Sequence, residues 1–121
     1  MKKIRKMATT LAVLVMAGGA AMGVGSVDAS AQTESGKVSW YNVTGKKTAS
    51  GKTGKATTAA HKTIAFNTKV TVKNTSNGKT TTVYILDRGP YVSGRILDMS
   101  KESFSKVAKT SAGLFDGKIT W

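Results

Sequence analysis

The feature that most constrains the fold is a pair of strand-like runs joined by a tight turn signal. Residues 69–73 alternate polar side chains with valine, and residues 80–86 are β-branched and aromatic apart from a final leucine. Both compositions are typical of β-strands. Asn77-Gly78 lies between the runs and is a strong local signal of a β-hairpin. The sequence therefore predicts an antiparallel hairpin that turns at Asn77-Gly78.

An aspartate follows the second run directly. A side-chain period of two places Val83, Ile85 and Asp87 on one face of the predicted strand. If the two aliphatic side chains face the core, Asp87 lies at the rim of an apolar interior, just before Gly89-Pro90. A carboxyl group in such a place is harder to ionise than one in water. The alternative is a turn aspartate that accepts backbone hydrogen bonds, and the spacing alone does not separate the two.

The first 31 residues have the three parts of a secretory signal peptide. Four basic residues lie between Met1 and Lys6, a small and apolar run extends to about Val24, and Ala29-Ser30-Ala31 is a small-x-small exit. The alternative is a membrane anchor, but four glycines between positions 18 and 25 argue against a stable spanning helix. We therefore predict export, cleavage after Ala31, and an extracellular protein associated with the cell wall.

Charge indicates the kind of partner. Cleavage after Ala31 leaves 90 residues, which keep 15 of the 19 basic residues and 5 of the 6 acidic ones. Such an excess of positive charge favours an anionic partner. We do not expect nucleic acid, because an exported domain rarely meets it and aromatic side chains for base stacking are few. Peptidoglycan glycan strands or another anionic cell-wall polymer fit better.

The remaining pattern is that of a small all-β domain. A domain of this size buries little surface, and the chain has no cysteine to form disulfides, so a closed β-architecture is needed. Hairpins and short strands suggest a small barrel with one short helix. The expected segments are a disordered lead-in at 32–36, a strand at 37–43, a loop at 44–58, a helix at 101–109 capped by Ser100, and a last strand at 117–121.

Six short motifs occur together in the order seen in rare lipoprotein A-like proteins. They are Ser39-Trp40-Tyr41, Thr48-Ala49-Ser50-Gly51, Thr58-Ala59-Ala60-His61, Asn77-Gly78, Asp87-Arg88-Gly89-Pro90-Tyr91 and Gly94-Arg95-Ile96-Leu97-Asp98-Met99-Ser100. The chain thus resembles a family of septal lytic transglycosylases. The resemblance covers nearly all of residues 32–121 and implies a six-stranded double-psi β-barrel, a fold shared with expansins and barwin-like domains.

The resemblance also implies site residues. Its catalytic pair matches His61 and Asp87, and Asp98 is similar to the essential acid of expansins. Substrate-binding residues are expected in the same motifs: Tyr41, Thr48, Ser50, Arg88, Tyr91 and Arg95. No cofactor or metal is expected, because a lone histidine lacks the partners that a metal site needs.

The implied chemistry needs only one acid. It protonates the leaving oxygen of the MurNAc–GlcNAc bond, and its conjugate base takes the proton of the muramyl 6-hydroxyl, which leaves a 1,6-anhydro end. Asp87 is the candidate acid, His61 could orient it, and Tyr41 could stack on a sugar. The alternatives are a non-catalytic wall-binding barrel of the expansin kind and a small secreted inhibitor of cysteine proteases, whose partner would be a protease. We expect a monomer.

Overall fold

The computed structural model describes residues 31–121, of which Thr33–Trp121 form one compact unit. The predicted signal peptide, apart from Ala31, lies outside the described residues. The elements in chain order are β1 (Thr33–Tyr41), β2 (Thr58–Ala60), β3 (Lys69–Asn74), β4 (Thr80–Asp87), β5 (Arg95–Ser100), helix α2 (Lys101–Phe104), the 3₁₀ turn η1 (Thr110–Ala112) and β6 (Leu114–Thr120).

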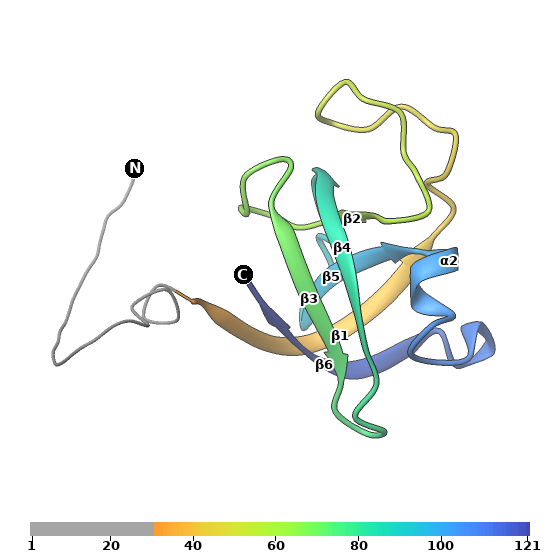
Figure 1. Ribbon diagram of the computed structural model, residues 1–121. Coiled ribbons are helices and arrows are strands. Elements are labelled where there is room, and N and C mark those ends of the chain that lie inside the picture. Colours follow the sequence, from red (N-terminus) through yellow and green to blue (C-terminus); the bar gives the residue numbers. More distant parts are fainter. Residues whose placement is uncertain (1–30) are drawn as a thin grey trace, which may run out of the picture. The chain divides into compact units, whose positions relative to one another are not determined.

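The six strands close into a barrel in the order β1-β5-β2-β4-β3-β6. Two pairs are parallel, β1 with β5 and β2 with β4, and the remaining pairs are antiparallel. Figure 1 shows the long strands wrapping around one another, with α2 following β5. The expected six-stranded double-psi β-barrel with one short helix is confirmed.

The predicted hairpin is one of the antiparallel pairs of this barrel. Strands β3 and β4 pair in a register that sets Val70 opposite Val83, and both side chains are fully buried. Gly78 has a φ of 76° at the turn, a conformation that glycine adopts without strain. The hairpin supplies four of the core side chains, Val70, Val72, Val83 and Ile85. The core consists of Val38, Ala59, Ile64, Val70, Val72, Val83, Ile85, Leu97, Met99, Phe104, Val107, Phe115 and Ile119.

The expectation of a disordered lead-in was wrong from Thr33 onward. Strand β1 begins there and pairs with β6 from Thr33 opposite Thr120 to Gly36 opposite Gly117. Both glycines are closely packed, because a Cβ atom at Gly36 would lie 2.6 Å from Ile96 Cγ2. This part of β1 is held by backbone pairing rather than by apolar side chains, so its composition did not reveal it.

Two strands were not predicted as strands. They are β2, with three residues, and β5, and both lie within motifs that the sequence singled out for chemistry. The last strand begins at Leu114, three residues earlier than predicted, and ends at Thr120. All three strands are short or contain polar residues, so a period-two pattern of apolar side chains is weak in them.

The helix is shorter than the predicted 101–109. Ser100 caps α2 as expected, because its Oγ accepts a hydrogen bond from the Ser103 amide. The helix ends at Phe104 and turns follow, while the side-chain amides of Asn74 and Asn77 donate to the Val107 carbonyl at 2.9 and 3.0 Å. The hairpin thereby binds a carbonyl in the turn that follows the helix. Within residues 31–121 no helix is long and apolar enough to cross a membrane.

Candidate active site

A β-bulge decides where the Asp87 side chain points. Strand β4 pairs Ile85 with Ala59 but Asp87 with Ala60, so the register shifts and Leu86 is an extra residue. A bulge of this kind breaks the alternation of faces along a strand. Asp87 therefore shares the face of Ala60, and the predicted alignment of Asp87 with the core residues Val83 and Ile85 was wrong. The side chain is half-buried.

Both oxygens of the Asp87 carboxylate accept hydrogen bonds. The Tyr41 hydroxyl, at the end of β1, donates to Oδ2 at 2.8 Å. The backbone amide of Ala49, in the loop after β1, donates to Oδ1 at 2.9 Å. Residues from two other segments thus fix the carboxylate at the C-terminal end of β4. The sequence indicated such a turn-type aspartate as the alternative to a buried acid.

The loop at 44–57 is ordered by its own hydrogen bonds. Thr48 is buried, and its Oγ1 lies 2.9 Å from Ser50 Oγ and donates to the Lys52 carbonyl at 2.7 Å. The Ser50 amide donates to the Leu86 carbonyl at 3.0 Å, which ties the loop to β4 beside Asp87. Thr48 and Ser50 were predicted to bind substrate. In the structure their hydroxyls shape the loop that delivers the Ala49 amide to Asp87.

A second acid lies across the same short strand. Ala60 of β2 pairs with Asp87 on one side and with Asp98 of β5 on the other. Strands in a sheet are about 4.8 Å apart, so the two acids flank Ala60 at a separation of about two strand spacings. Asp98 accepts a hydrogen bond from the Ser39 hydroxyl, two residues before Tyr41 on β1. The structure therefore brings Asp87, Asp98 and Tyr41 together, as the motifs suggested.

The tyrosine at this site keeps its proton. Burial raises the pKa of Tyr41 well above its usual value, and the hydrogen bond to Asp87 and the charges of Asp87 and Asp98 raise it further. Tyr41 is consequently a hydrogen-bond donor to the carboxylate. The charges of both acids raise the pKa of the same phenol, which is a second indication that the two acids lie in one site.

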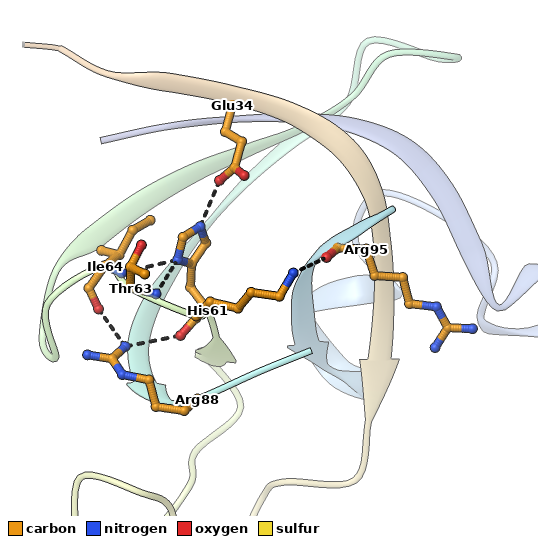
Figure 2. A network of polar contacts seen from close by, with 7 residues as sticks. Glu34, His61, Thr63, Ile64, Arg88 and Arg95 are labelled. Atoms are coloured by element: carbon orange, nitrogen blue, oxygen red, sulfur yellow. Dashed lines mark hydrogen bonds and ion pairs between the residues drawn. The ribbon is translucent and has the colours of Figure 1, made fainter. Parts of the chain in front are cut away.

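The His61 side chain points elsewhere. The histidine follows β2 directly and is 5% exposed. Its Nε2 lies 2.7 Å from Glu34 Oε1, and its Nδ1 accepts hydrogen bonds from the amides of Thr63 and Ile64 (Figure 2). The contact between His61 and Asp87 is made by the backbone: the His61 amide donates to the Asp87 carbonyl at 3.2 Å. The ring is thus in contact with Glu34 and its own loop.

Arg88 also has a local role. Its Nη1 donates to the carbonyls of His61 and Ile64 at 3.0 and 2.6 Å. Its guanidinium lies over the Phe66 ring, 4.1 Å from the ring centre, which is a cation–π arrangement. Figure 2 shows this side chain directed at the loop that follows His61. Predicted as a substrate-binding residue, Arg88 is used in the structure to anchor the segment after Asp87.

The two remaining predicted residues lie apart from these contacts. Tyr91 is 76% exposed, four residues after Asp87. Arg95 begins β5, its carbonyl lies 3.5 Å from Lys62 Nζ, and its guanidinium points away from the His61 contacts in Figure 2. Among residues 31–121 no three acidic or histidine side chains are grouped closely enough to hold a metal ion.

Sequence reasoning missed three functional groups. Glu34 was assigned to the disordered lead-in, although β1 carries it to His61. The period of two that turns Val38 inward assigns Glu34 to the same face, and this was the available signal. Nothing in the composition singles out the Ala49 amide or the Ser39 hydroxyl, because their partners lie 38 and 59 residues away.

Known protein families and curated proteins give close matches. A family profile described as "Lytic transglycolase" matches residues 33–119. Endolytic peptidoglycan transglycosylase RlpA of Campylobacter jejuni is 42% identical over 92 residues, covering 73% of this chain and 34% of the relative. The protein of the same name from Vibrio cholerae is 44% identical over 94 residues, covering 72% and 35%. The chain therefore spans about a third of the length of these curated relatives.

Solved structures share the fold. Streptomyces papain inhibitor matches with a TM-score of 0.59 and 24% identity, covering 74% of this chain and 92% of the inhibitor. A Clavibacter michiganensis expansin mutant in complex with cellohexaose matches with a TM-score of 0.57 and 20% identity, covering 73% and 49%. At these identities the likeness concerns the barrel alone.

Proposed function

Because this chain belongs to the lytic transglycolase family, we propose that it is a lytic transglycosylase acting on peptidoglycan. The bond cleaved is the one between MurNAc and GlcNAc, and the product carries a 1,6-anhydro end. Asp87 is the general acid and base of the reaction. The observation that supports this most is the carboxylate itself: it is half-buried, fixed by Tyr41 and the Ala49 amide, and accompanied by Asp98 across Ala60.

The reaction follows from one carboxyl group used twice. Protonated Asp87 gives its proton to the glycosidic oxygen as the bond to the leaving sugar breaks. The resulting carboxylate takes the proton of the muramyl 6-hydroxyl, whose oxygen attacks the same anomeric carbon and closes the anhydro ring. No water enters the products. Asp98 supplies a nearby negative charge, which favours the developing positive charge on the sugar ring.

The hydrogen bonds around Asp87 suit a group that changes charge. The Tyr41 hydroxyl and the Ala49 amide both act as donors to Asp87, and neither has to accept a hydrogen bond from it. Each of these donors is held by its own element, Tyr41 by β1 and Ala49 by the loop tied to the Leu86 carbonyl. Preorganised donors of this kind require no rearrangement when the proton leaves. The exposed Tyr91 ring, four residues on, is available to stack on a sugar.

The bond that is cleaved belongs to an anionic cell-wall polymer, which the protein has to bind. On the outer face of the barrel Lys69 and Lys73 project from β3, and Lys73 stands directly opposite Lys118 of β6. Like charges opposite each other on neighbouring strands destabilise a sheet, and a bound anion would relieve that repulsion. These three exposed lysines, here called the outer lysine face, are the surface that we assign to wall binding. The same anionic wall suits an extracellular location, which the signal peptide predicts.

The activity is tested by product analysis. The protein is incubated with purified sacculi and, separately, with peptide-stripped glycan strands, and the products are identified by mass spectrometry. Muropeptides or glycan ends lighter by one water than the hydrolysis products are the expected result. Binding without any anhydro product on either substrate would contradict the proposal and favour a wall-binding barrel of the expansin kind. Failure to bind wall at all would leave inhibition of a cysteine protease as the reading to test.

A further inference from the structure

The His61 ring has no free nitrogen. Nδ1 lies 3.0 and 3.1 Å from the amides of Thr63 and Ile64, and Nε2 lies 2.7 Å from Glu34 Oε1. The side chain is 5% exposed, and the Trp121 ring lies 5.9 Å away between ring centres. Every polar atom of the ring is therefore committed to a protein partner, none of which is an acid of the proposed active site.

These contacts define one tautomer of the ring. An N–H group can only donate, so Nδ1 must accept both hydrogen bonds and carries no proton. The ring proton is then on Nε2, which donates to the Glu34 carboxylate. A proton on Nδ1 would face two backbone N–H groups at hydrogen-bond distance. The geometry thus requires a neutral imidazole with its hydrogen on the Glu34 side.

The backbone of His61 connects this locked ring to Asp87. The His61 amide donates to the Asp87 carbonyl. The His61 carbonyl accepts from the side-chain guanidinium of Arg88, the next residue after Asp87. Arg88 also donates to the Ile64 carbonyl, within the turn whose amides bind Nδ1. The ring therefore organises the turn at 61–64. This turn binds the Asp87 carbonyl through the His61 amide and binds the Arg88 side chain through the carbonyls of His61 and Ile64, and Figure 2 shows the two Arg88 contacts.

We propose that His61 is a positioning residue and that Glu34 fixes it. The ring exchanges no proton with substrate; it orders the 61–64 turn. This turn sets the direction of the Asp87 carboxylate through the bond from the His61 amide to the Asp87 carbonyl and through the bonds from the Arg88 side chain to the His61 and Ile64 carbonyls. The inference rests on the proposed function for the meaning of Asp87, but the tautomer of His61 can be measured without any activity. Because Glu34 is the second residue of β1, the proposal also gives the beginning of this strand a function.

The first experiment is nitrogen-15 NMR of the ring. The chain contains one histidine, so the full-length protein gives one pair of ring nitrogen signals. The expected result at neutral pH is an unprotonated Nδ1 and a protonated Nε2 coupled to a single hydrogen. In Glu34→Gln the glutamine oxygen accepts the same hydrogen bond, and the tautomer is expected to stay. A protonated Nδ1, or a positively charged ring, would overturn the proposal whatever the protein's activity.

The second experiment separates positioning from proton transfer. In His61→Asn the asparagine Oδ1 takes the place of Nδ1 and accepts from the Thr63 and Ile64 amides, as in an Asx turn. We expect His61→Asn to keep kcat within about tenfold of wild type, and His61→Ala to lose about 10²-fold through misplacement of Asp87. Asparagine cannot act as a general acid or base, so an equal loss in both variants would overturn the proposal.

Folding and substrate controls keep the result interpretable. Both variants are compared at equal folded concentration by circular dichroism, with Asp116→Asn as a surface control whose side chain is 65% exposed. If His61→Ala does not fold, rescue of folding and kcat by His61→Asn still supports positioning. If wild type yields no anhydro product, the proposed function fails, and the NMR experiment alone decides the tautomer.

Discussion

The Tyr41 hydroxyl donates a 2.8 Å hydrogen bond to Oδ2 of Asp87, although the two residues are 46 positions apart in the chain. The contact joins the end of β1 to the end of β4, which are not neighbours in the barrel order. It brings a half-buried phenol and a carboxylate into one site beside Asp98. The consequences can be tested on stability as well as on activity.

Stability at high pH should report on Tyr41. The pKa of its phenol is raised, first by burial and then by Asp87, above the value of 10.0 that applies in the unfolded chain. The folded protein therefore holds this proton more tightly, and the resulting stabilisation is complete below pH 10 and is lost as the pH rises through the folded pKa. We expect the difference in unfolding free energy between wild type and Tyr41→Phe to shrink above pH 10.

Urea unfolding of both proteins at pH 7, 9 and 11 measures this difference. Lysine titration affects both proteins alike, so Tyr41→Phe corrects for it. A difference that stays constant to pH 11 would show that Asp87 and burial do not hold the Tyr41 proton.

The hairpin could be predicted because its signals are local. Asn77-Gly78 specifies the turn, and the alternating valines of β3 specify which side is buried. The direction of Asp87 could not, because the extra residue Leu86 appears only when β4 pairs with the three-residue strand β2. Glu34 was missed for a related reason: its partner is 27 residues away, and the strand that carries it has few apolar side chains.

The motif resemblance named residues that lie far apart in the sequence but close together in the structure. Asp87 and Asp98 lie on either side of Ala60, and the Tyr41 hydroxyl donates to Asp87. The motifs did not indicate that the side chains of Thr48, Ser50 and Arg88 form hydrogen bonds with the protein's own backbone. Those contacts depend on loop conformation, which short motifs do not encode.

Replacement of Gly54 should disturb the site through the loop. A Cβ atom there would lie 2.1 Å from the Val43 carbonyl oxygen, so Gly54→Ala forces the 44–57 loop to shift. Overpacking of this kind costs about 1–3 kcal/mol in unfolding free energy, and the shift withdraws the Ala49 amide from Asp87. We expect faster proteolysis within the loop and lower kcat. Equal protease resistance and kcat in wild type and Gly54→Ala would contradict the loop's role.

Wall binding should depend on the outer lysine face. Lys73→Gln with Lys118→Gln removes the opposed pair of charges, while Lys55→Gln with Lys106→Gln removes two exposed lysines elsewhere. Retention on insoluble sacculi is measured at 0.1 and 1 M salt, where the Debye length falls from about 10 to about 3 Å. We expect the first pair to weaken retention at 0.1 M more than the second, and high salt to weaken it in all proteins. Equal retention by both double variants would mean that the outer lysine face contributes no more to wall binding than other exposed lysines do.

Export is tested by the mass of the protein found outside the cell. The leader predicts cleavage after Ala31, so the intact mass of protein from the culture medium should correspond to a chain that begins with Gln32. Such a chain keeps Glu34 and therefore the contact with His61. A membrane-bound protein that retains residues 1–31 would contradict the prediction.

The most direct test of the account is the rate at which Asp87→Asn releases 1,6-anhydromuramyl products from peptide-stripped glycan strands. Asparagine keeps the shape of the side chain but cannot donate a carboxylic proton, and loss of general acid–base catalysis costs about 10²–10⁴-fold in rate. Asp116→Asn is the matched control, since it makes the same chemical change at an exposed carboxylate that is paired with Lys37. At equal folded concentration, the account predicts a loss of at least about 10²-fold for Asp87→Asn and wild-type release for Asp116→Asn. Release by Asp87→Asn at the wild-type rate would contradict it.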